Sequence, residues 1–481
     1  MGAVTDPLRL RDETEAVLSY VERTAKEYLA GLDEAPVLAS GADRAAERFG
    51  GGLPEQGDGA LAALTELVEG GLDAATGSAG PRFFHFVTGG VTPAALGADW
   101  LASTLDQNAL SAVSSPLGAR LEAVAVAWLL DLFELPASWG GVLTTGATSA
   151  NFTALAAARS WWAQRHDVDV DQRGFEGLPA VPVFSSGYVH ASATKALAML
   201  GIGRGSVRIL SRDAAGRLDL DALERELTAL RGAPAILIGN TGDVNTGDFD
   251  PIGRMADLAD RFESWLHVDG AFGLFARLTP RAAGLAAGVE RANSVISDGH
   301  KWLNVPYDCG FAFVRDPAHL RATFALSAAY LPGDEFAAPA APELSRRARS
   351  LAVWATLRAY GRAGYRAMVE RHLELAQHLA RRVDESPELE RLADVPLNIV
   401  CFRFRTPGLG DDELDELNAR LGEELLADGR VYVGTTRYRG RVAFRPAIVN
   451  WRTTEADVDL IADVVLELGA RATRASRARA G

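Results

Sequence analysis

The sequence predicts an α/β protein with a largely parallel sheet. Six short apolar runs have the length of buried strands, and helical patterns lie between several of them, as at residues 220–230 and 252–262. Strands that alternate with helices in this way favour a parallel sheet, and ligands usually bind where its strands end. The six runs are residues 181–184, 207–210, 235–238, 265–268, 294–297 and 310–314.

Helices are predicted before this alternating region. Leu and Ala recur at helical spacing in residues 12–31 and 60–72, and residues 91–133 also read as mostly helix. Residues 50–59 contain Gly, Pro and Asp and are expected to form a linker between the first two helices.

The C-terminal part is predicted to form a small α+β domain. Residues 331–344 lack periodicity and are expected to be mobile, and a long helix is predicted over 351–383. A strand, a helix, a strand and a helix follow, and the basic tail at 471–481 is expected to be frayed. These four elements are residues 398–404, 411–426, 442–448 and 454–468.

Charge and composition exclude several classes of function. The chain has 481 residues and a formal net charge of −14, so nucleic acid is not an expected partner. No apolar run approaches the roughly 20 residues that span a bilayer, and the N-terminus lacks the apolar core of a signal peptide. Cys309 and Cys401 are the only cysteines, which argues against a disulfide framework or a cysteine metal site. We expect a cytoplasmic protein without a membrane partner.

Lysine is rare in this chain, and one lysine has an unusual setting. Only three of the 49 Lys and Arg residues are lysines, namely Lys26, Lys195 and Lys301. Lys301 lies in Asp-Gly-His-Lys-Trp, directly after a predicted buried strand. A lysine that burial desolvates loses its proton more easily and becomes a nucleophile, which arginine does not. The alternative reading is a surface lysine.

Two other strand ends carry residues suited to a flat, phosphorylated ligand. Asp269 ends an apolar strand and precedes Gly and Ala, so its carboxylate could pair with a protonated ring nitrogen. Residues 140–151 are rich in small and hydroxyl-bearing residues and lead into a helix, which is an arrangement that binds anions. The alternatives are a turn aspartate and an ordinary Ser/Thr helix cap. The second segment lacks the lysine of a nucleotide-binding loop.

Two further residues complete the predicted site. His190 follows the strand at 181–184 and could stack on a flat ring, although a core histidine is the alternative. Tyr330, at the start of the predicted mobile segment, could deliver a proton from a closing loop, although it could also be an anchoring aromatic. His85 and His267 are interpreted as core residues, and no metal-ligand spacing is present. Together, an anion loop, a stacking ring, a carboxylate and an amine predict a pyridoxal 5'-phosphate (PLP) site.

At these residues the chain resembles the group II PLP-dependent amino-acid decarboxylases. The strongest motif is Asp-Gly-His-Lys-Trp-Leu-Asn-Val-Pro-Tyr-Asp-Cys-Gly at 298–310, supported by the motifs at 268–273 and 145–151. The resemblance implies fold type I, which is aspartate-aminotransferase-like, with a mainly parallel seven-stranded sheet in the large domain. The implied divisions are a helical N-terminal segment at a dimer interface, a PLP-binding domain and a small C-terminal domain. They cover residues 1–86, 87–345 and 346–481.

The resemblance also implies roles for single residues. Lys301 would form the Schiff base, Asp269 would pair with the pyridine nitrogen, and Tyr330 would reprotonate the substrate carbon. The ring would lie between His190 and Ala271. The phosphate would be bound by Ala147, Thr148 and His300, with Asp298 nearby where many members carry Asn, and Arg445 would contact the substrate carboxylate.

The substrate is predicted to be an aromatic or bulky apolar L-amino acid. The basis is the cluster of Phe83, Phe84 and Phe86, which would line the pocket mouth, although these residues could instead be core. An acidic substrate would need another cation, for which Arg82 is the candidate. Asp243, where aromatic enzymes carry threonine, and the glutamate-branch pair at 107–108 leave the substrate open. The alternatives are aldehyde synthesis, carbon–carbon lyase chemistry or transamination on the same scaffold, and a silent PLP-binding protein.

Overall fold

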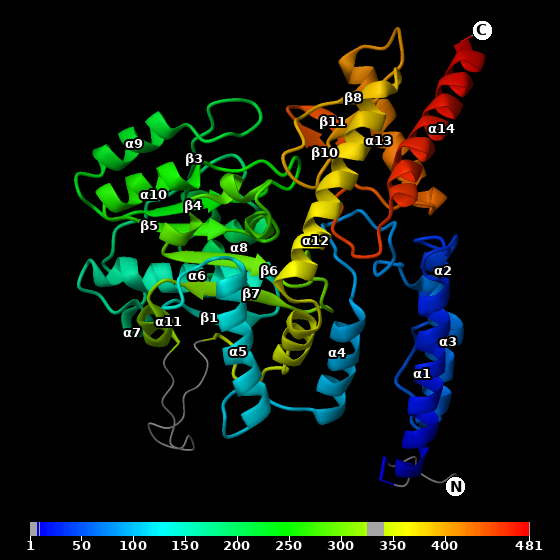
Figure 1. Ribbon diagram of the computed structural model, residues 1–481, viewed down its shortest axis with the longest axis horizontal. Helices are drawn as coiled ribbons and strands as arrows, with labels where there is room; N and C mark the ends of the chain where they lie inside the picture. Colours follow the sequence, from blue (N-terminus) through cyan, green and yellow to red (C-terminus); the bar gives the residue numbers. More distant parts are fainter. Residues whose placement is uncertain (1–6, 9, 325–340, 481) are drawn as a thin grey trace.

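The computed structural model describes residues 7, 8, 10–324 and 341–480, and it contains the predicted sheet (Figure 1). Seven strands are ordered β1-β7-β6-β5-β4-β2-β3. β7 runs antiparallel to β1 and β6, and the remaining neighbours are parallel. The strands are β1 (Gly140–Thr144), β2 (Val183–Ser185), β3 (Val207–Ile209), β4 (Ile236–Asn240), β5 (Trp265–Asp269), β6 (Ser294–Asp298) and β7 (Gly310–Val314). The predicted mainly parallel seven-stranded sheet is confirmed.

Strand β1 was not predicted, because its sequence begins with two glycines and lacks a β-branched run. Gly141 has no room for a side chain, since an added Cβ would lie 2.7 Å from Cδ1 of Phe313 on β7. The glycines therefore permit close packing at this edge of the sheet.

The two faces of the sheet are covered by different helices. On β5, Trp265 packs in the core that contains Trp162 of α6 (Ala147–Gln164), whereas Leu266 and Val268 pack in the core that contains Met255 of α10 (Ile252–Arg261). Alternate side chains of a strand point to opposite faces, and the central strands β4, β5, β6 and β7 are buried along their whole length, so the middle of the sheet is covered on both sides. Further helices of this region are α7 (Val170–Arg173), α8 (Ala191–Met199), α9 (Leu220–Ala229) and α11 (Pro317–Thr323).

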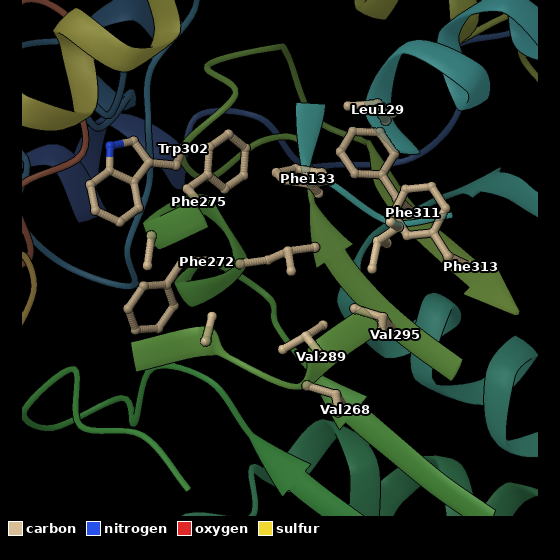
Figure 2. Close-up of a cluster of buried hydrophobic side chains, with 14 of the residues drawn as sticks. Leu129, Phe133, Val268, Phe272, Phe275, Val289, Val295, Trp302, Phe311 and Phe313 are labelled. Carbon is tan, nitrogen blue, oxygen red and sulfur yellow. The ribbon is translucent and has the colours of Figure 1, made fainter. Parts of the chain in front are cut away.

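An aromatic cluster fills the largest core and continues to the predicted lysine loop (Figure 2). Phe275 lies edge-on to Phe133, with ring centroids 5.1 Å apart, and its centroid is 6.0 Å from that of Trp302. Trp302 is fully buried and donates from Nε1 to Nδ1 of His372 at 2.8 Å. Burial lowers the pKa of His372 to about 3, so this imidazole is a neutral acceptor. The residue after Lys301 is thus anchored in the core.

The N-terminal helices lie to one side of the molecule (Figure 1). They are α1 (Thr14–Gly31), α2 (Ala42–Ala46) and α3 (Ala60–Gly71), and neither α1 nor α3 contains a buried residue. The two predicted N-terminal helices are confirmed. The region predicted as mostly helix at 91–133 forms two helices, α4 (Pro93–Leu105) and α5 (Pro116–Leu132), separated by a turn after Asp106, which has φ +45°.

The C-terminal part contains a four-stranded antiparallel sheet, ordered β10-β11-β9-β8, behind the long helix α12 (Ser350–Glu385). The strands are β8 (Leu389–Arg391), β9 (Phe402–Phe404), β10 (Thr435–Tyr438) and β11 (Arg441–Phe444), with helices α13 (Asp411–Asp428) and α14 (Glu455–Ala480). β8 and β10 were not predicted, and the strand predicted at 442–448 ends at Phe444. The prediction of a frayed tail at 471–481 was wrong, because α14 continues to Ala480.

The long helix belongs to both cores. Val353 and Val369 of α12 pack in the core with the large sheet, whereas Leu379 and Val383 pack in the core with the small sheet. Non-helical backbone at Gly361, with φ +58°, interrupts the helix. The predicted domain boundaries at 86 and 345 stay a prediction, and residues 331–340 of the segment expected to be mobile lie outside the described residues.

Candidate active site

A cavity of about 410 Å³ opens where the strands of the large sheet end. It brings together most of the residues predicted from the sequence, which come from separate strand ends and from α6. Those that line it are Phe86, Ala147, Thr148, His190, Asp269, Ala271, Asp298, His300, Lys301 and Arg445. Tyr330 lies outside the described residues.

Asp269, at the end of β5, is held by neutral hydrogen-bond donors. Its Oδ2 accepts from Nδ2 of Asn151 at 2.9 Å, and its Oδ1 accepts from the backbone N–H of Ala271 at 3.1 Å. The residue is 6% exposed and makes no ion pair with any residue that the structure describes. A buried carboxylate without a cation fits a ligand that supplies one, such as a protonated pyridine ring.

A chain of hydrogen bonds orients Asn151 from behind. Oδ1 of Asn151 lies 2.8 Å from Nε2 of His267, and Nδ1 of His267 lies 2.8 Å from Oγ of Ser294. Burial lowers the pKa of His267 to about 4, so the ring is neutral and carries one proton. Nε1 of Trp265 donates to Ser294, which leaves the serine proton for Nδ1 of His267 and places the histidine proton on Nε2, facing Asn151. His267 is a core histidine, as predicted, but it also fixes the amide that holds Asp269.

The anion-binding end of the cavity is the start of α6. The first N–H groups of a helix have no partner within it, and here they belong to Ala147, Thr148 and Ser149. Gly146 precedes them with φ +144°, and a Cβ added there would lie 3.3 Å from Cε1 of His300. The loop therefore lies against the histidine of the lysine motif. The N–H of Ala147 donates to Oδ1 of Asp298 at 2.9 Å, and the start of the helix as a whole suits a phosphate group.

Lys301 extends into the cavity from the loop between β6 and β7. Its Nζ lies 3.6 Å from Oδ2 of Asp298 and 5.7 Å from the ring centroid of Phe272. The loop backbone is fixed from the other side, because the N–H of Gly89 donates to the carbonyl of His300 at 3.0 Å. A Cβ at Gly89 would lie 1.7 Å from the carbonyl oxygen of Lys301, so only glycine fits there.

His190 is the N-cap of α8, and its tautomer is set by that position. Its Nδ1 accepts from the backbone N–H of Ser192 at 3.2 Å and lies 2.7 Å from Oγ of the same residue. Burial lowers the pKa of His190, so the ring is neutral and carries its proton on Nε2. A flat neutral ring at the cavity wall suits stacking. That a cofactor lies between His190 and Ala271 stays a prediction.

Arg445 is a buried cation without a counter-charge. It is 8% exposed, its Nη1 has no hydrogen-bond partner, and it forms no ion pair within the described part of the chain. Burial lowers its pKa, an effect that Asp243 partly opposes. The carboxylate of Asp243 is itself occupied, because Oδ2 accepts from the N–H groups of Asn245 and Thr246. The guanidinium can therefore bind a carboxylate of a ligand.

Two of the three phenylalanines predicted at the pocket mouth lie elsewhere. Phe83 is stacked on Tyr432, with ring centroids 5.2 Å apart, and Phe84 packs in the core of the small domain. Phe86 alone of the three lines the cavity, and it is 64% exposed. Arg82 is also not free for a substrate, because it pairs with Asp457 at 3.6 Å and donates to the carbonyl of Asp33.

Sequence reasoning did not assign a role to three residues of the site, which are Asn151, Tyr307 and Thr88. Asn151 stands in the anion motif, but its contact with Asp269 joins residues far apart in the chain. Oη of Tyr307 lies 3.1 Å from Oγ1 of Thr88, and the Tyr307 ring is stacked on His300 with centroids 4.2 Å apart. Tyr307 belongs to the lysine motif, so its inclusion in that motif was the available signal.

One group of potential metal ligands lies outside the cavity. Ligand atoms of His378, Glu455 and Asp459 lie within 4.8 Å of one another in the described part of the chain. Oδ1 of Asp459 is already bonded to Nε2 of His378 at 2.7 Å and to Nη1 of Arg382 at 3.2 Å. His378, Arg382 and Asp459 form a side-chain network between α12 and α14. That the protein uses no metal stays a prediction.

Fold and site together define a PLP-dependent enzyme of fold type I. Comparison with known proteins specifies the family. The model of the pyridoxal-dependent decarboxylase conserved domain matches residues 67–405, which is most of the chain. The chain belongs to this family and is a PLP-dependent amino-acid decarboxylase.

Relatives within the family differ in their substrates. The chain is 33% identical over 429 residues to L-2,4-diaminobutyrate decarboxylase of Rhizobium meliloti (strain 1021), covering 86% of this chain and 83% of the relative. It is 28% identical over 389 residues to aromatic-L-amino-acid decarboxylase of Bacillus atrophaeus, covering 79% of each. A crystal structure of Oryza sativa TDC with PLP and tryptamine has a TM-score of 0.87 at 25% identity, covering 96% of this chain and 98% of that one.

No described helix is long and apolar enough to cross a membrane.

Replacing Asn151 by leucine is expected to lower kcat about 10- to 100-fold, or ~1.4–2.8 kcal/mol in the barrier. Asp269 would lose its side-chain donor, and the Nε2 proton of His267 would lose its acceptor. The visible spectrum of bound PLP, followed against pH, should show earlier loss of the ring-nitrogen proton. Thr153→Val, a buried change on the same helix, is the control. Unchanged kcat and spectrum in Asn151→Leu would contradict this role.

Proposed function

We propose that this decarboxylase acts on an aromatic or bulky apolar L-amino acid and releases carbon dioxide and a primary amine. The observation that carries the proposal is the charge of the cavity. Its described lining contains one lysine and one arginine, Lys301 and Arg445. Since Lys301 would hold the cofactor aldehyde, Arg445 is left for the α-carboxylate, and no described cation remains for a second carboxylate.

The rest of the described lining favours an apolar side chain. Phe86, Val87, Val244 and Phe272 contribute apolar surface, and Tyr307 contributes an aromatic ring. A distal ammonium, as in diaminobutyrate, would need a free carboxylate, but Asp243 is occupied by its own turn. Burying an unpaired charge costs more than an apolar contact returns, so both charged classes are disfavoured.

The residues of the chain have distinct tasks in this reaction. When bound, PLP supplies an electron sink for the bond to the departing carboxylate. Lys301 would hold the cofactor and release it to the substrate amine, and Asp269 would keep the ring nitrogen protonated. The phosphate would rest on the amides of Ala147 and Thr148, beside His300. Tyr330 is proposed to return a proton to the α-carbon, directly or with His190.

Lys301→Ala is expected to abolish amine production and the visible absorbance of covalently held PLP. Lys301 is the one residue of its loop with a side-chain amine, so no neighbouring residue should restore the activity or the absorbance. Amine is measured by chromatography and absorbance by spectrophotometry. Lys195→Ala, which changes an exposed lysine on α8, is the matched control. If absorbance and turnover both survive in Lys301→Ala, the assignment of the lysine is wrong.

A panel of substrates tests the amino-acid class and the reaction type. Carbon dioxide release from Phe, Tyr, Trp and dihydroxyphenylalanine should exceed that from Glu and 2,4-diaminobutyrate by about 100-fold or more in kcat/KM, because the latter pair would bury an unpaired charge. The amine should be the product. Aldehyde with ammonia would indicate the synthase alternative, and a keto acid would indicate transamination. A preference for glutamate or diaminobutyrate would overturn the substrate proposal while leaving the decarboxylase assignment intact.

We also propose that the protein is a homodimer. Apolar side chains are exposed on α1 and α4, including Leu18 at 59%, Leu101 at 57% and Leu105 at 45%. Large exposed apolar surfaces of this kind mark protein interfaces. We put the N-terminal helices at this interface, as the resemblance to the family implies, and the lack of buried residues in α1 and α3 supports the proposal. The cytoplasmic location stays a prediction.

Light scattering is expected to give a dimer for the unmodified chain, near twice its 51.2 kDa. The double variant Leu101→Asp/Leu105→Asp should dissociate, because two buried carboxylates would be unpaired at the interface. Met199→Asp changes an equally exposed side chain on α8 and should remain dimeric. A fully active monomer would contradict the proposed assembly.

A further inference from the structure

The carboxylate of Asp298 occupies part of the anion site that the phosphate needs. Asp298 is the last residue of β6 and is 2% exposed. Its Oδ1 accepts from the backbone N–H of Ala147, the first residue of α6, at 2.9 Å. Its Oδ2 lies 3.6 Å from Nζ of Lys301 and 3.3 Å from Nε2 of His300. The protein therefore places its own anion at the helix end that is to receive a phosphate.

Among the described residues, Lys301 is the one lysine or arginine side chain that forms an ion pair with this carboxylate. Burial and Lys301 lower the pKa of His300 to about 4, so that ring is neutral. Asp269 adds a second negative charge nearby. Tyr307 and Cys309 also face Asp298, and burial raises the pKa of both groups, so they stay protonated and neutral.

Binding of a phosphate monoester changes this balance. The phosphate brings a charge of about −1.5 to −2 at pH 7. Lys301, which offsets Asp298 in the chain alone, is the group that engages the aldehyde of the cofactor. Two anions in a buried site repel strongly, and one of them gains by taking a proton. Burial already raises the pKa of Asp298 to about 6, although Lys301 and the N–H of Ala147 act against this rise.

We propose that Asp298 takes up a proton when the cofactor phosphate binds and then donates a hydrogen bond to a phosphate oxygen. A protonated carboxyl next to a phosphate forms a charge-assisted hydrogen bond, whereas a carboxylate there is repelled. This gives Asp298 the role of a neutral donor, which an amide would fill at any pH. The inference concerns cofactor binding and does not depend on which amino acid is the substrate.

The proposal sets the sign of the pH dependence. Below about pH 6 Asp298 already carries the proton, so phosphate binding costs nothing at this residue. Above that pH the proton must be taken from solution, and the affinity for PLP falls by up to about tenfold per pH unit. The fall ends where the pH passes the still higher pKa of Asp298 in the complex.

The test measures dissociation constants for PLP and for pyridoxal, which carries the same aldehyde without the phosphate. The full chain, freed of cofactor, and its Asp298→Asn variant are titrated by absorbance at pH 6, 7 and 8. At pH 8 the variant is expected to bind PLP about 10- to 100-fold more tightly than the unmodified chain, and at pH 6 the two should differ little. For pyridoxal, the ratio of the two constants should not change with pH.

Asp308→Asn is the matched control. Asp308 lies in the same loop, and its carboxylate pairs with Arg349 at 2.6 Å. This variant should keep the pH dependence of the unmodified chain. If Asp298→Asn binds PLP no more tightly at pH 8, or if pyridoxal shows the same pH-dependent gain, the proposal is overturned.

A second measurement on the unmodified chain covers the case in which the variant fails to fold. Calorimetric titration at pH 7.5 in two buffers of different ionisation enthalpy counts the protons taken up on binding. More protons should be taken up with PLP than with pyridoxal, since only PLP brings a second anion to Asp298. Equal proton counts for the two compounds would overturn the proposal.

Discussion

The site is organised around a buried carboxylate that has no cation of its own. Asp269 is held by Asn151 and by the N–H of Ala271, which are neutral donors and do not cancel its charge. Removing a carboxylate from water costs several kcal/mol unless a charge or donors compensate. The chain of donors through His267 and Ser294 compensates in part and joins α6 to β5 and β6. A ligand with a protonated ring nitrogen would supply the missing positive charge, as the predicted role of Asp269 requires.

The direction of β7 places the lysine beside that carboxylate. β6 and β7 are antiparallel neighbours, so the loop between them returns at the same edge of the sheet where β5 ends. The N–H of Gly299 donates to the carbonyl of Cys309 at 3.0 Å, which closes the base of this loop. A Cβ at Gly310 would lie 2.5 Å from the backbone of Gly146, so glycine there lets the anion loop and the lysine loop touch. The loop at Gly146, which is predicted to bind the phosphate, and the loop that carries Lys301 are adjacent for this reason.

Much of the fold and most of the site could be predicted from the sequence, because the signals were local. Strands β4, β5 and β6 are short segments with apolar residues that end in Asn or Asp, and Lys301 stands out in a chain almost without lysine. Phe83 and Phe84 were misplaced because an apolar residue in a loop can pack on either side of it. Strand β1 was not predicted because it begins with two glycines, which have a low propensity for strands. The link between Asn151 and Asp269 spans 118 residues, and no local pattern records such a contact.

The N-terminal helices have an apolar face that a second subunit is proposed to cover. α1 has 18 residues, and in proteins most of the stability of a helix comes from packing of its apolar face rather than from helix propensity. It buries no residue, and its Leu18 lines a surface hollow that Trp100 of α4, which is 41% exposed, also lines. The proposed dimer would supply a partner surface for this uncovered apolar face. The same argument applies to Phe86, whose exposed ring at the cavity mouth would then face the partner subunit, so that assembly and exclusion of water from the site would be one event.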